Sequence, residues 1–84
     1  MIGMEDRMAH RSLFLIAREI ARDWKKPYFG AVPYIQAMMT MDSPNDNYGY
    51  DPGHEIVLYF LANANTWRGE VARRVKAELQ DMVK

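Results

Sequence analysis

The sequence contains no cysteine, which excludes a disulfide framework, thiolate catalysis and a cysteine-based zinc site. It also carries no net charge, because 11 Lys and Arg are balanced by 11 Asp and Glu. Dedicated nonspecific nucleic-acid binders normally have a clear basic excess, so this balance argues against that class. No apolar run approaches the roughly 18–20 residues that span a bilayer, and the first residues lack the apolar stretch of a signal peptide. We therefore expect a soluble, cytoplasmic protein that makes no membrane contact.

Lysine and arginine are absent from residues 27–55, which contain four acidic side chains and so have a charge of −4. Residues 1–26 and 56–84 each have a net charge of +2. The acidic middle can be neutralised by the basic ends within one fold, or it can meet the basic end of another copy. A chain of 84 residues is long enough for one small domain, which we assign to residues 1–84.

The longest apolar run, Ile56 to Ala62, organises the predicted fold. On a helix its side chains point in every direction, which is typical of a helix in the centre of a packed core. A strand remains an alternative, because periodicity alone does not separate the two for so short a run. The flanking residues favour a helix over about 52–64, since Asp51 supplies an N-cap and Pro52 suits the first helical position. We therefore predict a central helix with no face exposed to water.

Three further helices are predicted around the central one, over about 5–26, 33–41 and 67–83. The last begins after Thr66, which we expect to cap it. Turn-forming residues dominate 42–51, which we predict to be a long, exposed and acidic loop. The fold class is therefore all-α: a small four-helix domain with a long polar loop between its second and third helices. Trp24 and Trp67 lie on the apolar faces of their helices, so we expect both to be buried near the central helix.

A row of basic side chains runs along the first predicted helix, opposite its apolar face. Phe14 and Leu15 flank this row and do not face the core, so they are candidates for apolar anchors in a polar contact. Two interpretations stay open: a solvated helix face, or an interface for an acidic protein partner or for the acidic middle of a second copy. The residues that we take as partner-binding candidates are Arg7, Arg11, Phe14, Leu15, Arg18, Arg22 and Lys25.

The last two helices raise an alternative function, a DNA-binding regulator with a helix-turn-helix-like pair. The bases that favour this alternative are Arg68, Arg73, Arg74 and Lys76. Against it, the turn at 63–65 lacks the usual glycine, and acids are interleaved with the bases. We also expect Arg74 to pair within its own helix with Glu70 and Glu78, at i, i+4 spacing. Protein is therefore the expected partner, and nucleic acid is the alternative.

Residues that could carry chemistry are few. His54 lies beside Glu55, but no second histidine stands at metal-ligand spacing, and acids are common in the first turn of a helix. Aligning Gly49 with the turn glycine of a calcium loop leaves Pro44 and Tyr48 at positions that need carboxylates. We therefore predict that the protein is not an enzyme and uses no metal or cofactor.

Five short segments carry a resemblance to known sequences: Asp23-Trp24, Tyr28-Phe29, Val32-Pro33-Tyr34, Ile56 to Ala62 and Thr66-Trp67-Arg68-Gly69. In these segments the chain resembles small uncharacterised proteins of actinobacterial phages, over about residues 20–80. The resemblance implies an accessory phage protein that binds a host or phage protein inside the host cell. It transfers no site residue and no mechanism.

Overall fold

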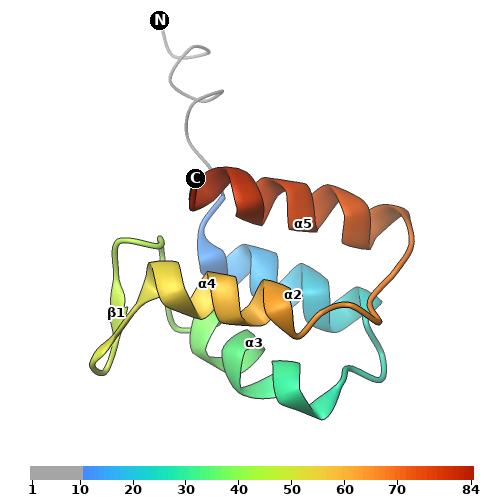
Figure 1. Ribbon diagram of the computed structural model, residues 1–84, viewed down its shortest axis with the longest axis horizontal. Helices are drawn as coiled ribbons and strands as arrows, with labels where there is room; N and C mark the ends of the chain where they lie inside the picture. The colour runs from blue at the N-terminus through green and yellow to red at the C-terminus, as the bar shows by residue number, and fades with distance from the viewer. Residues whose placement is uncertain (1–10) are drawn as a thin grey trace, which may run out of the picture.

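The computed structural model describes residues 11–84, and most of this part of the chain is helical (Figure 1). Within it, four α-helices and one short 3-10 helix, η1, are joined by connections that include a two-stranded hairpin. In chain order the elements are α2 (Leu13–Asp23), η1 (Phe29–Ala31), α3 (Val32–Met38), β1 (Asn47–Tyr48), β2 (Asp51–Pro52), α4 (Gly53–Ala62) and α5 (Glu70–Met82). The four predicted helices are thus present, together with a small antiparallel pair of strands that the all-α prediction lacked.

Helix α2 begins where Ser12 caps it, because the Ser12 hydroxyl accepts a hydrogen bond from the Leu15 N–H at 3.3 Å. Its buried face, at the spacing of an amphipathic helix, consists of Leu13, Ile16, Ala17 and Ile20. The helix ends at Asp23, three residues earlier than predicted, because Trp24 leaves the helical conformation with φ −94° and ψ 89°. The predicted part at 5–10 lies outside the described residues.

The four helices share one hydrophobic core, to which each contributes buried side chains. Helix α3 packs against both α2 and α4, and α5 lies along α2 (Figure 1). The hairpin stands at one end of the molecule, and the connection between α4 and α5 stands at the other. The acidic residues of 42–55 therefore gather near the hairpin, while the end of α2 and the start of α5 bring bases to the opposite end.

Three aromatic rings form the centre of this core. The Trp24 and Trp67 rings stack with centroids 5.8 Å apart, and both meet Phe60 of α4 edge-on. Trp24 is 8% exposed and Trp67 only 2%. The Trp67 indole N–H donates to Asp23 Oδ2 at 2.9 Å, which satisfies the one polar group of the ring. The prediction that both tryptophans are buried near the central helix is confirmed.

Helix α4 differs from the prediction in its exposure. Val57 and Phe60 are fully buried, but Leu58 is 48% exposed and Tyr59 is 46% exposed. The helix packs mainly on α3 and lies at the surface of the molecule, so one of its faces meets solvent (Figure 1). The prediction that no face is open to water is therefore wrong.

The start of α4 is capped by backbone groups, not by the predicted Asp51 side chain. Asp51 belongs to strand β2, and the Gly53 N–H donates to the Asp46 carbonyl at 2.6 Å. The His54 N–H donates to the Pro44 carbonyl at 2.9 Å. A Cβ at position 53 would lie 2.8 Å from Pro44 O and 2.9 Å from Asp46 O, so only glycine permits this approach. These two carbonyls satisfy N–H groups that a side-chain cap would otherwise serve.

The predicted loop at 42–51 is folded at its base and at its tip. The Asp46 carboxylate accepts hydrogen bonds from the Asp42 and Ser43 N–H groups, at 2.8 and 3.2 Å. Strands β1 and β2 then pair antiparallel, and Gly49 opens the two-residue turn between them with a φ of 64°, a conformation that favours glycine. Residues 45–52 are all exposed, so the prediction of an exposed acidic tip is confirmed, although the segment is a hairpin.

Helix α5 starts at Glu70, three residues later than predicted. Thr66 does not cap it, because Gly69 occupies the N-cap position and offers no side chain. Between them, Trp67 turns into the core and its carbonyl accepts a hydrogen bond from Lys76 Nζ at 2.7 Å. The helix then buries Ala72, Val75 and Leu79 against the core.

Candidate functional site

The predicted basic row divides into three groups. Arg7 lies outside the described residues. Arg11 is held in ion pairs, whereas Arg18, Arg22 and Lys25 are exposed along α2 and just beyond its end. Within residues 11–84, the exposed part of the row therefore consists of Arg18, Arg22 and Lys25.

Arg11 connects the start of α2 to α5 through two carboxylates. Its guanidinium donates two hydrogen bonds to Glu78, at 2.8 and 3.2 Å, and its Nη1 lies 2.8 Å from Glu19 Oε1. Arg74 of α5 donates to the other oxygen of Glu19. Hydrogen bonding from Arg74 lowers the pKa of Glu19, and hydrogen bonding to Glu78 raises the pKa of Arg11. Two arginines and two glutamates neutralise one another, so the charge of Arg11 is already paired within the fold.

The same network corrects the expected pairing on α5. Arg74 pairs across the helix interface with Glu19, and Glu78 pairs with Arg11, so the predicted i, i+4 pairs from Arg74 to Glu70 and Glu78 are wrong. The reason is tertiary, because α5 lies along α2 and brings Glu19 within reach of Arg74. Partners on another helix are invisible to a rule that counts four residues along the chain.

A shallow depression opens between α2 and the end of α3, and it contains the centre of the predicted site. The residues that line it are Phe14, Arg18, Ala21, Arg22 and Met39. The Arg18 guanidinium lies over the Phe14 ring, 5.4 Å from its centroid, which fixes a cation beside an apolar surface. In the described part of the chain neither Arg18 nor Arg22 has a carboxylate partner. The depression therefore combines apolar contact area with two guanidinium groups that can receive an anion.

The two predicted anchors have different places on α2. Phe14 is 39% exposed and Leu15 is 48% exposed, so both lie off the core face as predicted. Phe14 lines the depression, whereas Leu15 projects from the adjoining line of the helix and does not. Met39 is not among the partner-binding candidates predicted from the sequence, because a contact between α2 and the residue after α3 leaves no signal in local spacing.

The four bases around the start of α5 are also divided. Arg74 is paired with Glu19, and Lys76 donates to the Trp67 carbonyl. Arg68 and Arg73 are exposed and, within residues 11–84, have no carboxylate partner. The connection at 63–69 is seven residues long, longer than the three or four of a helix-turn-helix. The arrangement thus leaves two of the four bases free for nucleic acid and lacks the short turn of that motif.

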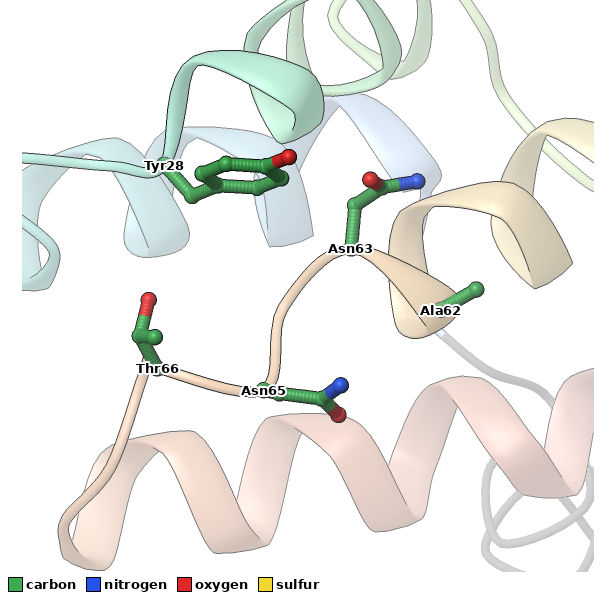
Figure 2. A pocket seen from close by; sticks show the side chains of 5 residues that line it. All are labelled: Tyr28, Ala62, Asn63, Asn65 and Thr66. Carbon is green, nitrogen blue, oxygen red and sulfur yellow. The ribbon is translucent and has the colours of Figure 1, made fainter.

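A second depression lies between the turn before η1 and the connection that follows α4. Figure 2 shows Tyr28 and Thr66 facing each other across the opening, with the Tyr28 hydroxyl directed toward Asn63. The Asn63 side chain also donates to the Tyr59 carbonyl at 2.8 Å, which fixes its orientation. The lining offers hydroxyl and amide groups, with no carboxylate, imidazole or amine. Such a surface can hydrogen-bond a neutral group but supplies no general acid or base.

In the part of the chain that the structure describes, no three His, Cys, Asp or Glu side chains gather closely enough to hold a metal ion. His54 and Glu55 are exposed in the first turn of α4. None of the helices within 11–84 has the length and apolar character needed to cross a membrane.

No protein-family model matches the chain, and no curated protein or solved structure matches it.

Proposed function

We propose that the protein is a small interaction module that binds an acidic segment of a partner protein in the depression between α2 and α3. In keeping with the sequence resemblance, we further propose that it is a phage accessory protein that acts in the host cytoplasm. The proposal rests mainly on the Phe14–Arg18 pair, in which an exposed ring and an exposed guanidinium meet beside Met39. Arginine and aromatic residues are the types that concentrate binding energy in protein interfaces.

Charge complementarity defines the partner that this surface suits. Arg18 and Arg22 stand one helical turn apart, so two carboxylates on an extended or helical segment can reach both. Phe14, Ala21 and Met39 offer apolar area between and beside them. A suitable partner therefore presents acidic side chains next to one apolar side chain.

A second copy of the protein satisfies the same description. Residues 42–55 carry four acids and two exposed tyrosines, and they stand at the hairpin end of the molecule. A synthetic peptide of residues 42–55 is therefore a defined probe of the chemistry that the depression recognises. Because this peptide is a segment of the same chain, its binding tests both recognition of an acidic partner and self-association.

The experiment measures binding of the labelled peptide to the parent and to variants by fluorescence anisotropy. We expect saturable binding that weakens as salt rises, because exposed charges are screened over about 8–10 Å. The double variant Phe14→Glu with Arg18→Glu should lose this binding while keeping the parent's circular dichroism and melting temperature, since both side chains lie outside the core. Lys84→Glu is the control for charge, because it makes the same charge change as Arg18→Glu on an exposed residue that does not line the depression.

Two results contradict the proposal. If the double variant is unfolded, the face is part of the core, and if it binds the peptide as the parent does, the face is plain surface. Sedimentation velocity of the parent separates the two kinds of partner. A concentration-dependent dimer that the double variant loses identifies a second copy as the partner, and a monomer that still binds the acidic peptide identifies a different protein.

A further inference from the structure

Three basic residues line one cavity where the connection after α4 meets the start of α5. Figure 1 shows these two segments at the end of the molecule opposite the hairpin. Arg68 comes from the connection after α4, and Arg73 and Lys76 come from the first two turns of α5. Asn65 and Trp67 also line this cavity. It has a volume of about 340 Å³, and no acidic residue lines it. It shares no residue with the depression beside α2.

Lys76 is held in place at this cavity. Its Nζ donates to the Trp67 carbonyl at 2.7 Å and lies 6.0 Å from the centroid of the Trp67 ring. An ammonium group has three N–H donors, so two remain for another acceptor. Burial lowers the pKa of Lys76, and the positive charge of Arg68 lowers it further. Two cations therefore stand close enough to repel each other, and no carboxylate relieves that repulsion.

The described arginines fall into a paired and an unpaired group, and the two of this cavity are unpaired, as are Arg18 and Arg22. Arg11 and Arg74 are neutralised by Glu19 and Glu78 in the network between α2 and α5. Arg68 and Arg73, by contrast, have neither an ion pair nor a side-chain hydrogen bond within 11–84. The sequence offers Glu70 between them, yet Glu70 does not line the cavity. A concave site with three converging cations and no counter-charge is suited to an anion.

We propose that this cavity binds the phosphate group of a small phosphorylated molecule. Guanidinium groups match the geometry of phosphate oxygens with paired N–H donors, and Arg68 and Arg73 are free to supply them. Lys76 adds a fixed point charge, and the Asn65 amide adds a neutral donor at the edge of the cavity. Trp67 is among the residues that line the cavity, and Lys76 Nζ lies 6.0 Å from its ring centroid, so we expect tryptophan fluorescence to report occupancy.

The test titrates the full chain with inorganic phosphate and with pyrophosphate, while potassium chloride keeps the ionic strength constant. Binding is followed by tryptophan fluorescence and confirmed by calorimetry. We expect a saturable signal that potassium chloride alone does not produce. Arg68→Gln and Arg73→Gln should each weaken the affinity about tenfold or more, because each removes a charged hydrogen bond to the anion. Both side chains are exposed, so these variants keep the fold.

Lys26→Gln is the control, since it removes one exposed cation that lines neither the cavity nor the depression beside α2. Its affinity for pyrophosphate should stay within about twofold of the parent's, because exposed charges are screened over about 8–10 Å. An equal loss of affinity in Lys26→Gln and Arg73→Gln would overturn the proposal, because the binding would then depend on general positive charge and not on this cavity. The proposal would also be overturned if potassium chloride alone changed the tryptophan fluorescence as much as phosphate does.

A single-stranded oligonucleotide serves as the last arm of the experiment. If it binds at least a hundred times more tightly than pyrophosphate and depends on Lys26 as strongly as on Arg73, the ligand is a nucleic-acid backbone. That result would overturn the assignment to a small molecule. Oligonucleotide binding no tighter than that of pyrophosphate supports the assignment.

Discussion

Replacing Trp67 with alanine tests the packing at the centre of the fold. Its ring is 2% exposed, stacks on Trp24 and meets the edge of Phe60. The indole N–H is bonded to Asp23, so truncation removes a hydrogen bond as well as apolar contact. Trp67 precedes α5 in the chain, and its hydrogen bond joins it to Asp23, the last residue of α2.

The expected cost follows from these contacts. Truncating a buried tryptophan to alanine costs about 3–5 kcal/mol through lost transfer energy and the cavity left behind. The hydrogen bond accounts for only about 1 kcal/mol of that sum, because the exposed Asp23 carboxylate is solvated once the indole is gone. A chain of 84 residues is expected to have a stability of about 4–13 kcal/mol in total. Trp67→Ala should therefore remove from about a quarter of the stability to all of it.

Urea denaturation followed by far-UV circular dichroism measures this loss without relying on the removed fluorophore. The midpoint should fall by at least about 1 M, given slopes of about 1–3 kcal/mol per molar urea for small proteins. Asp23→Ala isolates the hydrogen bond and should cost about 1 kcal/mol. Tyr50→Ala is the control, because it truncates a fully exposed aromatic residue and should change the stability by less than about 0.5 kcal/mol.

The assignment of Trp67 to the packed core is refuted if Trp67→Ala and Tyr50→Ala have the same urea midpoint. It is also refuted if Asp23→Ala accounts for the whole effect of Trp67→Ala, because then the hydrogen bond and not the packing would hold this region. A variant with unchanged dichroism but a lowered urea slope would show that the native state has become less compact.

Two more predictions concern the helix interface and the exposed face of α4. Glu19 has a lowered pKa in the folded protein, so its stabilising effect is present above the ordinary glutamate range, about 4.3, and is lost as the pH falls through the lower folded value. The melting temperature of the parent should therefore decrease more on acidification than that of Glu19→Gln, and parallel pH profiles for the two would contradict this. Leu58→Lys should change the stability by less than about 0.5 kcal/mol, because Leu58 is half exposed, whereas Ile56→Lys should unfold the domain by burying a charge. Thermal melts of the two variants compare them directly, and equal losses would restore the prediction of a helix buried on all faces.

Amphipathic spacing was sufficient to predict the parts of the fold that depend on burial alone. The buried face of α2, the burial of both tryptophans and the helical state of α4 all follow from which residues are apolar and how far apart they stand. The exposure of Phe14, Leu15 and the hairpin also follows, because polar and turn-forming neighbours specify it. These features need no knowledge of which element lies beside which.

The helix starts were predicted less well, because they depend on donors and acceptors that arrive from elsewhere in the chain. Asp51 and Thr66 are good cap residues by type, yet neither caps a helix. At α4 the carbonyls of Pro44 and Asp46 serve the first N–H groups instead, and the approach requires Gly53. Local preference is worth about 1 kcal/mol at a cap, and a tertiary contact of similar size can override it.

The candidate site also has one part that the sequence predicts and another that depends on the tertiary structure. Sequence alone determined that α2 would carry an exposed row of bases with Phe14 beside it, because hydrophobic spacing decides which face is buried. Only the tertiary structure decided which bases remain available, since Glu19 and Glu78 neutralise Arg11 and leave Arg18 free. A charge is neutralised by whichever opposite charge lies within a few ångströms, and that distance is set by packing between helices and not by spacing along the chain.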